Sequence, residues 1–313
     1  MSARLLRLGA TVVLLGFIAW RLDLQAVRSE FADLEFAWLA AALALTVPQV
    51  VISAWRWRLT ARRIGLELRL SEAIREYYLA TFLNQLLPGG VLGDAARAWR
   101  HGRDQPEAGD AWHAVVIERV SGQLSLALVA LIALACAPGL RIALFDRVPD
   151  LAELTWVLIA VIAALLATLA WYYRPAHGSR LRRFVGHARD NLLCTRIGLA
   201  QLFSSLLVVA SYIAVFVLAG RALDIDTPLA ELWVLVPPVL LAMALPLSVA
   251  GWGLREGAAA LVWMLAGLPP SQGVAISLAY GLIVLVSSLP GAMVLAARRP
   301  RGRSRPAQPL PDA

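Results

Sequence analysis

The feature that most constrains this chain is a series of apolar runs, each near the length that an α-helix needs to cross a bilayer. The clearest runs are 36–55, 112–137, 154–173, 199–220 and 273–297. A shorter run over 5–20 carries Arg7, and we interpret it as a first span because no small-residue cleavage site follows it. With 59% apolar and 16% charged residues, the composition exceeds what a soluble domain can bury. The sequence therefore predicts an all-α polytopic membrane protein.

The distribution of Arg predicts which side of the membrane each connecting segment faces. All 29 basic residues are Arg, and the formal net charge is +8. If the N-terminus is cytoplasmic, the cytoplasmic segments hold 22 Arg and the external segments hold five. This asymmetry obeys the positive-inside rule, so we expect both termini to be cytoplasmic. Because the Arg clusters alternate with apolar runs, we expect a surface of anionic lipid as the partner and no nucleic acid.

Two further apolar stretches, 77–99 and 232–268, are interrupted by Pro and Gly. A full crossing by the first would move the Arg-rich segment 174–196 to the outside, so we expect it to enter and leave on the cytoplasmic side. The part of the second stretch that follows Glu256 is too short to cross, so we interpret it as a hairpin from the opposite face. The prediction is about six full transmembrane helices plus two re-entrant broken hairpins.

The two breaks share a motif, L-P-x-x-V-x-G-x-x-x-R, over 87–97 and 245–255. Together with the order of the spans, this predicts an inverted repeat whose halves cover about 1–137 and 154–297 of a membrane domain at 1–297. Inverted repeats with broken helices are a transporter architecture. Helical apolar spacing between Arg residues over 180–192 predicts an amphipathic helix on the membrane surface. We expect 298–313 to be a disordered cytoplasmic tail rich in Arg and Pro.

A helix that breaks inside a bilayer leaves backbone groups without partners unless protein or a polar cavity surrounds them. The first turn of the following half-helix then offers free N–H groups to an anion. The residues predicted to form these breaks are Asn84, Pro88, Gly89, Gly90, Gly93, Pro246, Gly251 and Gly253.

Charged residues at membrane depth are few, and such residues are usually functional. We expect Arg97, Arg119 and Arg255 to bind an anionic lipid head group, because guanidinium forms bidentate contacts with phosphate. Asp94, Glu118 and Glu256 would balance this charge or carry protons. The alternative is that these groups form ion pairs that only lock the hairpins in place.

Other kinds of site find little support in the sequence. The four His show no ligand spacing and the two Cys are too few for a structural metal site, so we expect no metal and no cofactor. Neither a phosphate-binding loop for ATP nor a nucleophile with a nearby base is recognisable, so we expect no enzyme. Tyr77 and Tyr78 are interpreted as anchors at the membrane interface.

Three blocks of residues carry a resemblance to a known family. They are Asn84…Pro88-Gly89-Gly90…Gly93-Asp94…Arg97, then Glu118-Arg119…Gly122, then Pro246…Gly251-Trp252-Gly253-Leu254-Arg255-Glu256. In this order they resemble the lysylphosphatidylglycerol synthase transmembrane, or flippase-like, domain family of bacteria and archaea, over most of 1–297. Family members typically have P-G-G-x-G-G-D at the first break, where this chain has Leu92 in place of one Gly.

The resemblance implies a multi-pass protein of the bacterial plasma (inner) membrane that translocates an anionic phospholipid or a polyprenyl-linked lipid. In bifunctional members the domain is joined to a soluble aminoacyltransferase, for which a chain ending at Ala313 has no room, so we expect no synthase activity. A separate aminoacyl- or glycosyltransferase is an expected partner. Two other classes stay open: a non-transporting membrane assembly or partner protein, and an intramembrane lipid-modifying transferase with Asp94 or Glu118 as base. The oligomeric state stays open as well.

Overall fold

The computed structural model describes residues 24–32, 34–87, 90–103, 105, 107–139, 178–192, 195–243 and 251–297. Every regular element within these ranges is a helix, which confirms the predicted all-α class. The elements are α2 (Leu24–Ser29), α3 (Phe36–Ile64), α4 (Leu70–Leu86), α5 (Leu92–Gly102), α6 (Ala108–Ala135), α9 (Gly178–Leu192), α10 (Thr195–Ala222), α11 (Leu229–Ala242), α12 (Leu254–Leu265) and α13 (Pro270–Ala296).

Four of these helices, α3, α6, α10 and α13, are long and apolar enough to cross a membrane. They coincide with four of the predicted runs. The predicted spans 5–20 and 154–173 and the tail 298–313 lie outside the described residues. Large apolar side chains point outward along these helices, among them Phe36, Leu131, Phe203 and Met293, which are 66–76% exposed. Such an apolar exterior is expected of helices that face lipid.

Helix α3 continues past the predicted end of its span at residue 55. No Pro or Gly interrupts residues 56–64, and the helix ends where Gly65 takes a left-handed conformation with φ 96°. Arg56, which the sequence analysis placed in a cytoplasmic segment, therefore lies on a helix and is only 2% exposed. The predicted end of the span at residue 55 is wrong, because the helix runs on through Arg56 to Ile64.

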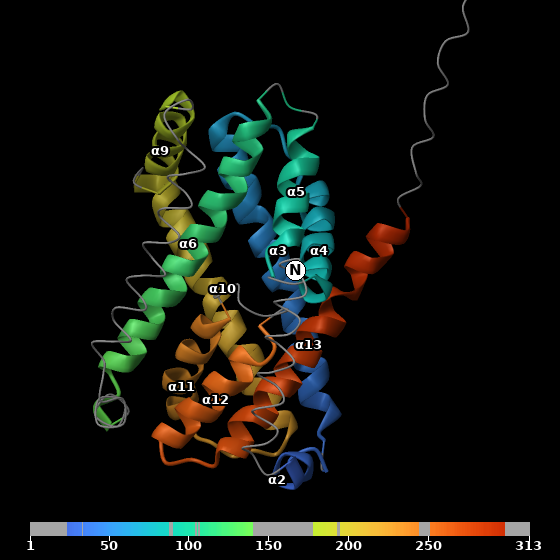
Figure 1. Ribbon diagram of the computed structural model, residues 1–313, viewed down its shortest axis with the longest axis vertical. Coiled ribbons are helices and arrows are strands. Elements are labelled where there is room, and N and C mark those ends of the chain that lie inside the picture. The colour runs from blue at the N-terminus through green and yellow to red at the C-terminus, as the bar shows by residue number, and fades with distance from the viewer. Residues whose placement is uncertain are drawn as a thin grey trace, which may run out of the picture.

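Two pairs of short helices meet the long ones from opposite ends of the molecule (Figure 1). Helices α4 and α5 lie beside α3 in the upper part, and α11 and α12 lie in the lower part. Helix α13 packs against both α4 and α12. Its contact with α4 is very close, since a Cβ at Gly291 would lie 2.3 Å from the carbonyl oxygen of Tyr78.

The motif shared by the two breaks does not occupy equivalent helical positions. Arg97 lies in the second turn of α5, which begins at Leu92. Arg255 is the second residue of α12, which begins at Leu254. Helix α12 therefore begins closer to the Arg of its motif than α5 does. Arg97 and Arg255 consequently project from different turns of their helices.

Helix α9 (Gly178–Leu192) includes the amphipathic segment predicted over 180–192. It packs against the beginning of α6 and against α10. In Figure 1 it lies at the upper end of the molecule, beside the start of α6.

Candidate functional site

A cavity of about 580 Å³ lies between the helices of the two halves of the chain. Ligand sites in proteins usually fall between about 300 and 1,000 Å³. Helices α3 to α6 supply one side of the wall, and α10, α11 and α13 supply the other. Most of the lining is apolar, but polar side chains gather on it: Gln49, Ser53, Tyr77, Thr81, Asn84, Gln85, Asp94, Arg119, Gln123, Tyr212, Tyr280 and Ser287.

Asn84 joins the end of α4 to the beginning of α5. Its Oδ1 accepts a hydrogen bond from the backbone N–H of Gly93 at 2.8 Å, and its Nδ2 donates to Asp94 Oδ2 at 2.9 Å. Gly93 allows this close approach, because a Cβ there would lie 2.0 Å from the carbonyl oxygen of Ala80. The amide of Asn84 thus satisfies one N–H at the start of α5 and orients the Asp94 carboxylate.

Asp94 in turn holds two guanidinium groups. Its Oδ1 lies 2.7 Å from Arg119 Nη2 and 2.9 Å from Arg97 Nε. The Arg119 side chain is 36% exposed and lines the cavity, whereas the Arg97 side chain is completely buried. Of these two guanidinium groups, that of Arg119 is therefore the one that a molecule in the cavity would meet.

Arg97 is enclosed by an acid and two aromatic rings. Its Nη2 lies 2.7 Å from Glu118 Oε2. Its guanidinium carbon lies 4.7 Å from the ring centroid of Trp57 and 4.6 Å from that of Tyr77. Cation–π contacts of this kind are most favourable where water is excluded, as it is here. Tyr77 is only 5% exposed and lies beneath the guanidinium, so its interpretation as an interfacial anchor is wrong.

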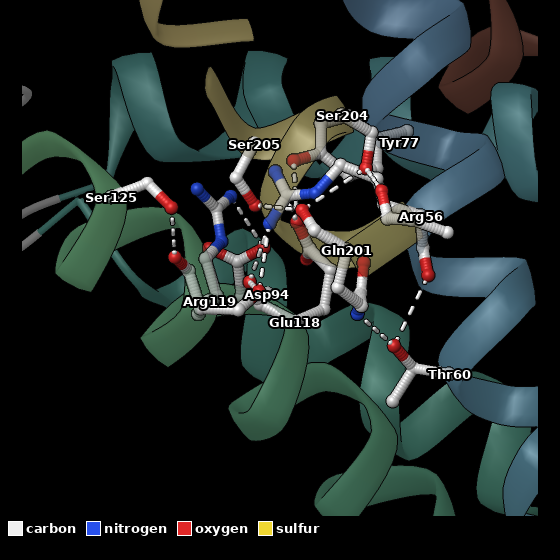
Figure 2. Close-up of polar contacts among 12 residues, drawn as sticks. Arg56, Thr60, Tyr77, Asp94, Glu118, Arg119, Ser125, Gln201, Ser204 and Ser205 are labelled. Atoms are coloured by element: carbon white, nitrogen blue, oxygen red, sulfur yellow. Dashed lines mark hydrogen bonds and ion pairs between the residues drawn. The ribbon is translucent and has the colours of Figure 1, made fainter. Parts of the chain in front are cut away.

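Arg56 extends this cluster from α3 toward α10 (Figure 2). Its Nη2 donates to the backbone oxygen of Glu118 at 3.0 Å and to Ser121 Oγ at 2.9 Å, and its Nη1 lies 3.6 Å from Glu118 Oε1. Farther along α3, Thr60 accepts a hydrogen bond from Gln201 of α10 at 2.6 Å. A small cavity of about 60 Å³ separates Arg56 and Glu118 from Ser205.

The sequence analysis did not find Arg56, although a signal was present. Gln49, Ser53, Arg56 and Thr60 are spaced so that they share one face of a helix. All four are buried within the helix bundle. A polar stripe along an otherwise apolar helix indicates a face turned toward the protein interior rather than toward lipid.

The charges of this cluster do not cancel. Within the part of the chain that the structure describes, it contains three guanidinium groups, from Arg56, Arg97 and Arg119, and two carboxylates, from Asp94 and Glu118. The cluster therefore carries a net charge of +1, and Arg119 is its guanidinium on the cavity wall. An uncompensated charge in a low-dielectric environment attracts a counter-ion strongly.

Arg255 and Glu256 form a separate ion pair at the second break. Ser277 of α13 contacts both: its Oγ accepts from Arg255 Nε at 2.8 Å and donates to Glu256 Oε1 at 3.1 Å. Trp252 and Tyr280 lie on the guanidinium, with ring centroids 5.1 and 5.3 Å from its carbon.

The second pair is neutral and fully buried. Arg255 and Glu256 are each 1% exposed. Tyr280 lines the cavity, whereas Arg255 and Glu256 do not. Glu256 Oε2 also accepts the backbone N–H of Gly253 at 2.6 Å, which caps the start of α12. The structure thus brings Arg97, Arg119, Asp94 and Glu118 into one cluster and keeps Arg255 and Glu256 apart from it.

Gly90, Gly251 and Gly253 have positive φ values of 61°, 82° and 87°, so the chain turns at both breaks in a conformation that favours Gly. Gly251 also lines the cavity. Pro88, Gly89 and Pro246 lie outside the described residues.

Comparison with known families identifies the family of this chain. The sequence profile of the lysylphosphatidylglycerol synthase TM region matches residues 4–291. The chain belongs to this family. The resemblance expected from the three sequence blocks is thereby confirmed, and the four apolar helices make this family member a multi-pass integral membrane protein. A search of curated proteins found none that matches it.

Proposed function

We propose that this member of the lysylphosphatidylglycerol synthase TM family is a flippase-like protein. It would bind an anionic phospholipid or a polyprenyl-linked lipid in the cavity and move the head group across the bilayer. The observation that carries this proposal is the net positive charge of the cluster together with Arg119, which is partly exposed to the cavity. An anionic head group would supply the missing negative charge, and the apolar lining would accept the first part of the acyl chains.

The proposal includes a topology with the N-terminus in the cytoplasm. In it, α4 and α5 form a re-entrant hairpin from the cytoplasmic side, and α11 and α12 form one from the external side. Two features support it: the 22 to 5 distribution of Arg, and the entry of the two helix pairs from opposite ends in Figure 1. The cavity lies where the two hairpins approach each other, since it is lined by Asp94 of α5 and by Leu240 of α11.

In this proposal the three Arg residues that the sequence predicted to bind the head group have different roles. Arg119 would contact the head group directly, because it is the guanidinium of the cluster that lines the larger cavity. Arg97 would act through Asp94, whose carboxylate it shares with Arg119. Arg255 would hold the second hairpin in place through Glu256 and Ser277.

The experiment that tests this proposal measures translocation of fluorescent phosphatidylglycerol and phosphatidylcholine in proteoliposomes. We expect the wild type to move the anionic lipid faster than protein-free vesicles do, and Arg119→Ala to lose most of that activity. Arg221→Ala is the matched control, since Arg221 pairs with Asp226 at the far end of α10. Wild-type rates in Arg119→Ala, or no translocation above the protein-free background by the wild type, would refute the proposal.

A non-transporting role is the second candidate, and the complete pairing of Arg255 with Glu256 favours it for that hairpin. If the buried charges serve only to fix the fold, replacing this isolated pair with neutral side chains of similar size, as Arg255→Met with Glu256→Gln, should preserve function in cells. Loss of function in a stably folded double variant would instead favour direct contact between this hairpin's charges and a lipid.

A further inference from the structure

Three groups that bind metal ions meet where α9 crosses the beginning of α6. Asp110 and His113 lie one turn apart on α6, and His187 faces them from α9. His113 Nδ1 lies 3.3 Å from His187 Nδ1 and 3.4 Å from Asp110 Oδ1. The third separation, from His187 Nδ1 to Asp110 Oδ1, is 3.9 Å. Each residue therefore presents one donor atom to a common point.

These separations fit the edges of a coordination tetrahedron. Zinc binds imidazole nitrogen and carboxylate oxygen at about 2.0–2.2 Å, so neighbouring ligand atoms in a tetrahedral site lie about 3.3–3.5 Å apart. Two of the three separations match that value. The third exceeds it by a few tenths of an ångström and involves His187, whose side chain is 20% exposed and has room to turn.

A second contact orients the carboxylate. Arg183 Nη2 donates to Asp110 Oδ2 at 2.8 Å, which leaves Oδ1 directed toward the two imidazoles. Hydrogen bonds to the outer oxygen of a liganding carboxylate are a regular feature of metal sites. The side chains of Asp110 and His113 are each 7% exposed, so the donors are already withdrawn from water.

We propose that Asp110, His113 and His187 bind a divalent ion of the zinc class. Two imidazoles and one carboxylate are the ligands that Zn²⁺ prefers, whereas Mg²⁺ and Ca²⁺ prefer oxygen alone. The bound ion links α9 to α6 and so holds this Arg-rich amphipathic helix against the membrane domain. This site is separate from the cavity and does not depend on lipid translocation.

The sequence expectation of no metal site was based on the spacing of the histidines. The two liganding histidines are 74 positions apart, and only the packing of α9 on α6 brings them together. Spacing rules find sites whose ligands share a local motif, and this site has none.

The experiment uses the full chain, purified without a polyhistidine tag, and titrates it with ZnCl2 by calorimetry. We expect one Zn²⁺ per chain at this site, and a loss of affinity of at least about tenfold, or 1.4 kcal/mol, in His113→Ala and in His187→Ala. Glu107→Gln and His101→Gln should bind like the wild type, because neither residue belongs to the donor set. MgCl2 should produce no comparable binding.

A second measurement keeps the test decisive if His113→Ala, in its buried position, folds poorly. Zn²⁺ should raise the melting temperature of the wild type and of Glu107→Gln, but not that of His187→Ala, since a ligand stabilises only a state that binds it. The proposal fails if the wild type binds Zn²⁺ no better than His187→Ala, or if Mg²⁺ gives the same shift. The close His113–His187 contact would then be a hydrogen bond between two imidazoles and nothing more.

Discussion

Arg97 and Glu118 are 21 positions apart in sequence, and their side chains meet at 2.7 Å in the interior. The Arg97 side chain is completely buried and that of Glu118 is 2% exposed. A pair so well enclosed is costly to break, because the remaining charge cannot return to water. This contact joins α5 to α6, and the contact of Arg56 with Glu118 joins α3 to α6.

Glu118→Gln is expected to destabilise the protein by about 3–5 kcal/mol, the usual cost of removing one partner of a buried ion pair. Arg56 would lose its carboxylate partner, and Arg97 would keep only Asp94. The measurement is the thermal unfolding of the purified protein in detergent. The matched control is Glu72→Gln on the exposed face of α4, for which a change within about 0.5 kcal/mol is expected. Equal melting temperatures for the two variants would contradict the prediction.

Gly93→Ala is expected to destabilise the first hairpin, at the upper end of the range of about 1–3 kcal/mol for an overpacked site. The new Cβ would lie 2.0 Å from the backbone oxygen of Ala80 and 2.8 Å from Asn84 Oδ1. Gly109→Ala on α6 is the control, since nothing lies within 4 Å of its Cβ position. Because Ala has a higher helix propensity than Gly, we expect the control variant to be as stable as the wild type or more stable. A Gly93→Ala variant as stable as Gly109→Ala would show that α4 and α5 are farther apart than described.

Tyr77→Phe and Tyr77→Leu separate the hydroxyl of Tyr77 from its ring. The hydroxyl lies 3.4 Å from Glu118 Oε1, and we expect its loss to cost no more than about 1 kcal/mol. The ring lies under Arg97 and near Arg119, and its replacement by Leu should cost about 1–2 kcal/mol more. Denaturant or thermal unfolding of the two variants checks this order. The reverse order would mean that the hydroxyl contact outweighs the cation–π contact.

Ala95→Trp is expected to reduce lipid translocation to about a tenth or less of the wild-type rate, because the indole would occupy the cavity that Ala95 lines. The melting temperature should change little, since the new side chain has space to enter. Ala40→Trp on the exposed face of α3 adds the same side chain outside the cavity and should translocate normally. Normal rates in Ala95→Trp would place the lipid pathway elsewhere.

The sequence analysis predicted the helical class, four of the long helices and the amphipathic segment, because each depends on a local pattern of apolar residues. It also selected Asp94, Arg97, Glu118, Arg119, Arg255 and Glu256, because ionisable residues stand out in apolar runs. It counted Arg56 in a cytoplasmic connecting segment, because counting Arg between apolar runs takes no account of a helix that continues past its apolar run. The spans at 5–20 and 154–173 stay predictions.

The sequence by itself determined that this chain is a helical membrane protein with a few charges at depth. Only the tertiary structure decided which charges meet, because partners such as Arg56 and Glu118 lie on different helices and are joined by packing rather than by spacing. The same holds for His113 and His187, whose approach depends on the docking of α9. Local patterns are set by hydrophobic periodicity along one helix, whereas the contents of a site depend on how the helices are turned toward each other.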